Sequence, residues 1–215
     1  MHISQDRTTI LLVRHGECRG NREGLFRGRT DFPLNQNGFM QAEDLAREIN
    51  RYHPDVLLTS PLTRAVQTAQ AISKLCQVKV QEQPELNNIQ LGPWEGRYKK
   101  EIATLFPLEW QKWIKQPENL NIPGMETLSQ VKNRVKYLLD RCVSEFFGQT
   151  ILFVSHRAVL KPLIAACLGM THSYFWRIHL DTASYTILHY KKTNGYILVQ
   201  LNQNRHLKKF VTEWQ

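Results

Sequence analysis

The chain has 215 residues, of which 42% are hydrophobic and 22% are charged, and its formal net charge is +9. This composition is that of an ordinary globular domain and excludes collagen-like, coiled-coil and low-complexity proteins. The longest apolar stretches are too short for a bilayer span, and the first residues lack the apolar core of a secretory signal, so we expect no membrane association. The four cysteines are widely scattered without metal-ligand spacing, which favours a reducing, cytoplasmic location.

The positive charge favours anionic partners. Most of the excess is spread along the chain, but residues 14–29 hold five arginines against two glutamates. Clustered arginine suits the bidentate recognition of phosphate or carboxylate. No zinc-finger spacing, aromatic RNA-recognition signature or basic heptad helix is present, so we do not expect a nucleic-acid partner.

The first elements alternate between strands and helices. The continuous apolar run over 8–16 predicts a buried strand ending at a glycine. Helical spacing of apolar residues predicts a helix over 33–52, followed by a short apolar strand over 55–60. A serine and a proline at 60–61 predict the cap and start of a helix over 62–75.

The middle of the chain is less regular. A weak strand is predicted over 78–81, and short helices over 99–106 and 108–114, separated by Pro107. The segment from about 98 to 123 interrupts the strand–helix alternation, so we interpret it as a helical lid or insertion.

Regular structure then returns. One face of residues 125–147 is apolar, which predicts a long amphipathic helix. A strand over 150–156, a helix over 158–169 and a hairpin of strands over 183–191 and 195–202 follow. The alternation predicts a single α/β domain over 1–215, a three-layer sandwich in which helices cover both faces of a mostly parallel central sheet.

Three predicted strands end in residues that carry chemistry. The first ends in Arg14 and His15, the second is followed one helical turn later by Arg64, and the fourth ends in His156. Ligands of such sheets bind outside the carboxyl ends of the strands, so these four side chains are expected to converge on one crevice.

The four side chains suit phosphoryl chemistry, which depends on positioning and charge neutralisation. Two guanidinium groups and a protonated His156 would surround the phosphoryl oxygens with donors. A neutral His15 would be an in-line nucleophile that forms a phosphohistidine. Because the protein supplies the positive charge, we predict neither a metal nor a cofactor.

The chain resembles the histidine phosphatase superfamily, in the branch that contains cofactor-dependent phosphoglycerate mutase and its phosphatase relatives. The resemblance rests on a series of motifs in the family's order: LLVRHGE, FRGRTDFPLNQNGFMQA, LTSPLTRAVQTA, LGPWEG, PGMETL and VSHRAVLKPLIAACLG. It implies that His15 is the phosphorylated nucleophile and that Arg14, Arg64 and His156 complete the phosphate pocket.

The same resemblance implies a set of substrate contacts. Asn21, Arg27 and Gly28 match loop positions that contact substrate in relatives. Arg157 stands where the family usually has glycine, so the contact carried over to it is that of the backbone N–H.

The main departure from the family concerns the general acid. Family members usually have a glutamate four residues before the first glycine of LGPWEG, where this chain has Asn88. An amide does not protonate a leaving alkoxide. Three explanations remain open: Glu85, or less favourably Glu95, replaces the acid; the substrate has a good leaving group; or the protein is a slow enzyme or a phosphate-ligand sensor.

The sequence therefore predicts a metal-independent phosphatase that hydrolyses a phosphorylated small molecule through a phosphohistidine on His15. Phosphoryl transfer of the phosphoglycerate mutase type and non-catalytic binding of a phosphorylated ligand are the alternatives. The sequence indicates neither the physiological substrate nor the oligomeric state.

Overall fold

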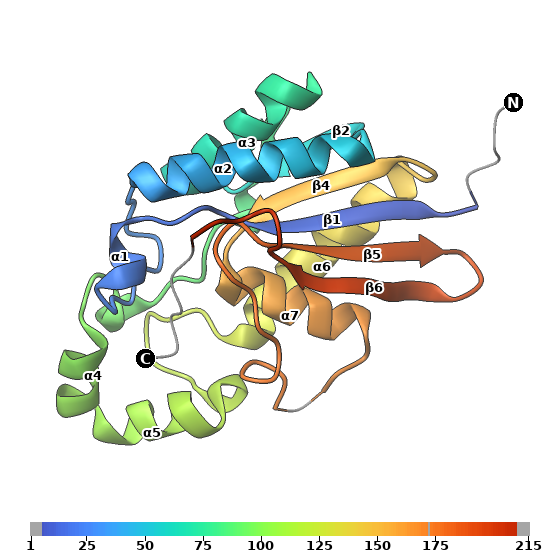
Figure 1. Ribbon diagram of the computed structural model, residues 1–215. Coiled ribbons are helices and arrows are strands. Elements are labelled where there is room, and N and C mark those ends of the chain that lie inside the picture. Colours follow the sequence, from blue (N-terminus) through green and yellow to red (C-terminus); the bar gives the residue numbers. More distant parts are fainter. Residues whose placement is uncertain (1–5, 172, 210–215) are drawn as a thin grey trace, which may run out of the picture.

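The computed structural model describes residues 6–171 and 173–209, which form a six-stranded sheet covered by helices on both faces (Figure 1). The strand order is β3-β2-β4-β1-β5-β6. The first four strands of this order are parallel, whereas β5 is antiparallel to β1 and β6 is antiparallel to β5. The strands are β1 (Thr8–Arg14), β2 (Val56–Thr59), β3 (Val80–Glu82), β4 (Thr150–Ser155), β5 (Tyr185–Lys191) and β6 (Gly195–Gln203). The prediction of a mostly parallel sheet in an α/β sandwich is confirmed.

Strand β1 is apolar on both sides because it lies in the middle of the sheet, between β4 and β5. Ile10 and Leu12 point into one hydrophobic core, and Leu11 and Val13 point into the other. Side chains of a strand alternate between the two faces, so a strand covered on both faces has a continuous apolar run.

Two pairs of helices cover the sheet. Helices α2 and α3 pack on one face, and α6 and α7 pack on the other (Figure 1). The α-helices are α1 (Arg19–Arg22), α2 (Gln36–Ile49), α3 (Thr63–Cys76), α4 (Lys99–Leu105), α5 (Pro107–Lys115), α6 (Leu128–Glu145) and α7 (Arg157–Cys167). The described 3-10 helices are η1 (Asn50–Tyr52), η2 (Pro84–Leu86), η3 (Gly92–Trp94) and η4 (Pro117–Asn119).

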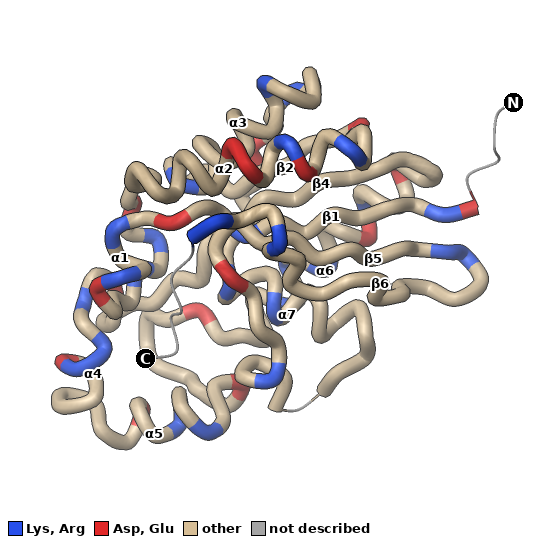
Figure 2. The backbone as a smooth tube through the Cα atoms, in the orientation of Figure 1, with Lys and Arg blue, Asp and Glu red and all other residues tan. Residues whose placement is uncertain are grey.

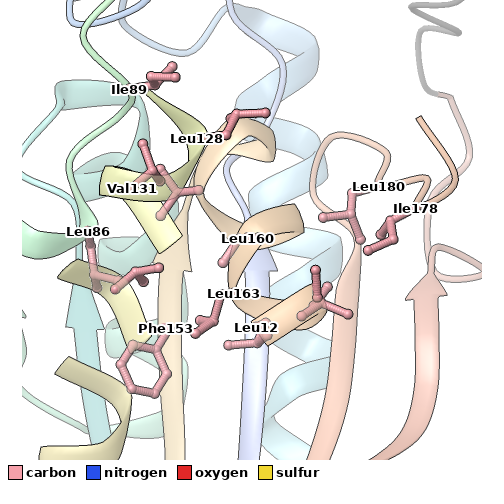
Figure 3. Close-up of a cluster of buried hydrophobic side chains, with 14 of the residues drawn as sticks. Leu12, Leu86, Ile89, Leu128, Val131, Phe153, Leu160, Leu163, Ile178 and Leu180 are labelled. Atoms are coloured by element: carbon pink, nitrogen blue, oxygen red, sulfur yellow. The ribbon is translucent and has the colours of Figure 1, made fainter. Parts of the chain in front are cut away.

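The core beneath α6 and α7 also holds the loops that surround the carboxyl ends of the strands (Figure 3). Val131 of α6 and Leu163 of α7 are fully buried against it, which stabilises the fold by roughly 1.5–3 kcal/mol per side chain. Ile89, from the loop after η2, and Leu180, from the loop before β5, belong to the same cluster. The loops that carry functional groups are thus fixed to the main core.

Every predicted helix and strand is present, with ends that differ by a few residues. One predicted start is wrong: α3 begins at Thr63, with Leu62 as its N-cap, and Ser60 does not cap it. Pro107 does separate α4 from α5, but as the first residue of α5. Helix α1, a single turn, was not predicted, because four residues show no periodicity.

The two helices expected in the segment 98–123 are α4 and α5, which lie beyond the carboxyl ends of the parallel strands (Figure 1). That this segment is an insertion in a single domain over 1–215 stays a prediction, and the extreme ends of that range lie outside the described residues. Within the described ranges, no helix is long and apolar enough to cross a membrane.

Candidate active site

Arg14 and His15 lie at the carboxyl end of β1, and both are almost completely buried. The backbone of His15 is held on two sides, because its N–H donates to Ser155 O (3.0 Å) and its carbonyl accepts from Ala183 N (3.1 Å). The next residue must be small: a Cβ at Gly16 would lie 2.7 Å from the carbonyl oxygen of Gly38. The sharp end of the apolar strand at RHG therefore places a histidine in a fixed backbone position.

Arg64 reaches the same place from the first turn of α3. Thr68, one turn further along, accepts from the Gly16 N–H (3.1 Å) and donates to Arg64 O (2.8 Å), which joins α3 to the end of β1. The two terminal nitrogens of Arg64 donate to Gly28 O (3.0 Å) and Thr30 O (3.1 Å). Its Nε is buried and has no hydrogen-bond partner among the described residues, so one donor is left for a ligand.

His156 directly follows the last residue of β4 and is the N-cap of α7. Its ring centroid lies 5.0 Å from that of His15, so the two imidazoles face one site. The Nε2 of His156 lies 2.7 Å from Ser60 Oγ, which also accepts from Leu62 N. The Nδ1 is buried with no partner in the described chain. If the serine hydroxyl donates to Nε2, then Nδ1 carries the proton and is a donor for a ligand.

Burial is the main cause that lowers the pKa of His15 well below its ordinary value, and the nearby charges of Arg64, Arg14 and Arg27 add to it. His15 is therefore neutral at neutral pH. Its Nδ1 lies 2.6 Å from Gly16 O, so in the neutral ring this nitrogen carries the proton. The lone pair is consequently on Nε2, as a nucleophile requires.

Burial, followed by the charge of Arg64, also lowers the pKa of His156 well below its ordinary value. A protonated His156 is therefore not favoured in the free protein, because the charges of Arg64, Arg27 and Arg14 act in the same direction as burial. Burial lowers the pKa of Arg64 to about 10, so its guanidinium stays charged at neutral pH. The site of the free protein thus combines neutral imidazoles with charged guanidinium groups.

A cavity of about 490 Å³ extends from His15 and His156. Arg27, Gly28 and Arg157, three of the residues predicted to contact substrate, line it. Asn21, the fourth residue predicted to contact substrate, does not line the cavity. It is buried in α1, where its Oδ1 accepts from the backbone N–H (2.9 Å) and the Sγ (3.2 Å) of Cys18.

Asn88 lines the same cavity as the two histidines. Its Nδ2 donates to Gly28 O (2.7 Å), the carbonyl that also accepts from Arg64, while its Oδ1 is buried with no hydrogen-bond partner in the described chain. The amide at the position where the family resemblance predicts an acid thus lines the cavity that holds His15 and His156.

Neither candidate for a replacement acid lines the cavity. The carboxylate of Glu85 lies 4.0 Å from the guanidinium of Arg141 on α6. Glu95 accepts from the backbone N–H groups of Arg29 and Thr30, and thereby closes the loop before α2. These placements do not support the hypothesis that Glu85 protonates the leaving group.

Three features of the site were not predicted from the sequence. Ser60 was assigned to a helix cap, but it holds the ring of His156; Thr68 joins two catalytic segments, and its only signal is its position four residues after Arg64. Trp110 and Trp113 line the cavity, while Trp113 also belongs to the main hydrophobic core and Trp110 packs against it; their spacing of three on one helix was the available signal.

In residues 6–171 and 173–209, no group of three His, Cys, Asp or Glu side chains is placed to hold a metal ion. An α/β sandwich with two histidines and two arginines at the carboxyl ends of its strands defines a phosphoryl-binding protein. The family model of the histidine phosphatase superfamily (branch 1) matches residues 10–204, and the chain belongs to that family.

Individual relatives agree with this assignment. Phosphoserine phosphatase 1 of Hydrogenobacter thermophilus is 34% identical over 95% of this chain and 96% of its own length. The adenosylcobalamin/alpha-ribazole phosphatase of Escherichia coli is 32% identical over 83% of this chain and 88% of its own. Among solved structures, Bacillus stearothermophilus YhfR superposes with a TM-score of 0.88 and 26% identity, over 94% of this chain and all of that one. The chain is a phosphoric monoester hydrolase.

Proposed function

We propose that the protein is a metal-independent phosphatase that hydrolyses a phosphorylated small molecule through a phosphohistidine on His15. The observation that carries this proposal is the state of His15, a buried neutral imidazole whose Nδ1 is engaged by Gly16 O and whose Nε2 is left to react. The guanidinium groups of Arg14 and Arg64 lie beside it and supply the charge that a phosphoryl group needs.

The reaction has two steps. The Nε2 lone pair of His15 attacks phosphorus, so that an N–P bond forms while the bond from phosphorus to the leaving oxygen breaks with its electron pair. Water then attacks phosphorus, the N–P bond breaks, and the electron pair returns to Nε2 as inorganic phosphate is released. Charge on the equatorial oxygens is stabilised by the two guanidinium groups and by donors at the amino end of α7.

Binding of the phosphoryl group changes the protonation of the site. A dianion beside His156 opposes the effect of the three arginines and favours the charged imidazole. The protonated His156 that the sequence analysis expected is thus favoured only when phosphate is bound.

Hydrolysis is favoured over mutase chemistry. A mutase must transfer a proton in both directions at the exchanged oxygen, and the residue at the acid position is an amide. The names of the relatives support a phosphorylated small molecule as substrate, including phosphoserine and alpha-ribazole phosphate as classes to test.

The test uses p-nitrophenyl phosphate, whose leaving group needs no acid. The wild type should turn over in the presence of EDTA, and His15→Asn should lower kcat at least about a thousandfold. Rapid quenching with 32P-labelled phenyl phosphate should trap an acid-labile phosphohistidine in the wild type only. His53→Asn, which changes an exposed histidine, is the control. Phosphate binding without turnover would replace this proposal by the binding-protein alternative, and loss of activity in EDTA would refute metal independence.

A further inference from the structure

The cavity next to His15 has a second, mainly aromatic part. Its aromatic wall consists of Phe26, Trp110, Trp113, Phe175 and Trp176. Three segments contribute: the loop after α1, helix α5, and two consecutive residues of the loop before β5. A phosphoryl group fills only the polar end near the histidines, so the wall is left for the rest of the substrate.

The aromatic wall is preorganised. Trp113 packs edge-on against Trp176 with centroids 5.4 Å apart, and Trp176 Nε1 donates to Trp113 O (2.9 Å). Phe175 is held by its backbone, since its N–H donates to Glu118 Oε1 and its carbonyl accepts from the buried Lys161 Nζ, both at 2.8 Å. A flat apolar group can pack against this wall without first having to order its aromatic side chains.

The charge of the lining residues restricts the substrate further. Arg27, Lys99 and Arg157 contribute positive charge, and no lining residue that the structure describes is an aspartate or glutamate. Among the described lining residues, a substrate ammonium group would therefore meet like charge and no carboxylate. This disfavours phosphorylated amino acids as substrates.

Asn88 restricts the leaving group. It lines the cavity with both histidines, and its amide gives the departing oxygen no acidic proton. A phenol has a pKa of about 10, so an aryloxide leaves without general acid catalysis, whereas an alkoxide is much more basic. The aromatic wall favours an aromatic ring in the substrate, and Asn88 independently favours a leaving group that needs no acid. Together they favour an aromatic ring bonded directly to the phosphate oxygen.

We propose that the substrates are aryl phosphate monoesters, in which His15 takes the phosphoryl group while the aromatic wall holds the ring. This inference rests on the proposed function. In the first step the P–O(aryl) bond breaks as the N–P bond forms, and the aryloxide leaves with the electron pair and takes a proton from water.

Four probes separate ring size from leaving group: 1-naphthyl phosphate, phenyl phosphate, benzyl phosphate and phosphoserine. We expect kcat/KM for 1-naphthyl phosphate to exceed that for phenyl phosphate by roughly tenfold, because the second ring contacts the wall. Phenyl phosphate should exceed benzyl phosphate by at least about a hundredfold, because only benzyl alcohol requires an acid. Turnover of phosphoserine should be weaker still.

Trp110→Leu tests the aromatic wall, with Tyr137→Leu on the exposed side of α6 as the control. Trp110→Leu should reduce the preference for naphthyl over phenyl by about three- to tenfold, and the control should leave it unchanged. Equal loss for all four probes in Trp110→Leu would overturn the role of the wall. Efficient turnover of benzyl phosphate or phosphoserine through His15 would overturn the aryl class and leave the proposed function intact, whereas no turnover of any probe and no trapped phosphohistidine would refute the proposed function.

Discussion

At the scale of single residues, the decisive feature is the amide at position 88. Asn88 Nδ2 donates to Gly28 O, the backbone carbonyl of another cavity-lining residue. A protonated glutamate can make the same kind of bond and can also release its proton. In the proposed function, phosphate binding does not require an acid at position 88, whereas protonation of the leaving group does.

Asn88→Glu should therefore add general acid catalysis. We expect kcat for benzyl phosphate to rise by about 10²-fold or more, and kcat for phenyl phosphate to change little, because aryloxide needs no acid. The gain should fall as pH rises and the new carboxyl group loses its proton. Steady-state kinetics across pH measure both effects. Asn88→Gln is the matched control, because glutamine has the length of glutamate but no acidic proton. An equal rise in kcat for benzyl phosphate in the two variants would contradict a role of the new acid.

At the scale of elements, α7 carries both halves of the site. Its first residues lie at the phosphoryl end, while Lys161, one turn later, is fully buried and supports the aromatic wall. The Nζ of Lys161 donates to Phe175 O and lies 4.7 Å from the ring centroid of Phe175 and 5.2 Å from that of Trp176. One helix thus connects the predicted phosphoryl end of the cavity to the aromatic wall.

Lys161→Met should disturb the wall and leave the phosphoryl site in place. The Phe175 carbonyl loses its donor, so we expect the free energy of unfolding to fall by about 1–3 kcal/mol. KM for 1-naphthyl phosphate should rise more than KM for phenyl phosphate. Urea unfolding and steady-state kinetics measure the two effects. Lys100→Met, which alters an exposed lysine on α4, should change neither quantity, and an unchanged ratio of the two KM values in Lys161→Met would show that Lys161 does not position the wall.

The elements themselves could largely be predicted from the sequence, because their patterns are local. β1 is continuously apolar, since both of its faces are covered, and α6 has one apolar face and a capping box at Thr127 and Gln130. The start of α3 was misplaced because Ser60 fits a local capping pattern, whereas its hydroxyl bonds to a histidine 96 residues away. Contacts between distant segments leave no local signal.

At the scale of the whole molecule, some site residues could be predicted from sequence patterns, whereas others are determined by contacts between distant segments. Arg14, His15, Arg64 and His156 could be placed together, because the carboxyl ends of parallel strands meet at one edge of a sheet. Glu85 was chosen by its nearness to Asn88 in the chain, but η2 turns its side chain toward α6, where it faces Arg141. The aromatic wall joins three separate segments, so only the folded chain shows it.

The stability of the whole molecule should depend on pH through two effects that act in the same direction. The chain carries a net charge of +9 before its histidines are charged, and Lys and Arg lie on many elements (Figure 2), so acidification adds repulsion. In addition, burial lowers the pKa of His15 and of His156 in the folded state. Between these lowered values and the unfolded value of about 6.5, the unfolded chain binds more protons.

Between pH 7.5 and 5.5, the free energy of unfolding should therefore change little down to about pH 6.5 and then fall, by up to about 1.4 kcal/mol per pH unit for each of the two histidines. Urea unfolding between pH 7.5 and 5.5 measures the slope. In the double variant His15→Asn, His156→Asn the slope should become smaller, but it should not vanish, because burial also lowers the pKa of His189 and of His206. His53→Asn should leave the slope unchanged.

High salt screens repulsion between exposed charges but not the cost of charging a buried ring, so the difference between wild type and double variant should persist in 0.5 M salt. A difference that disappears in salt would assign the pH dependence to the net charge instead of the buried histidines.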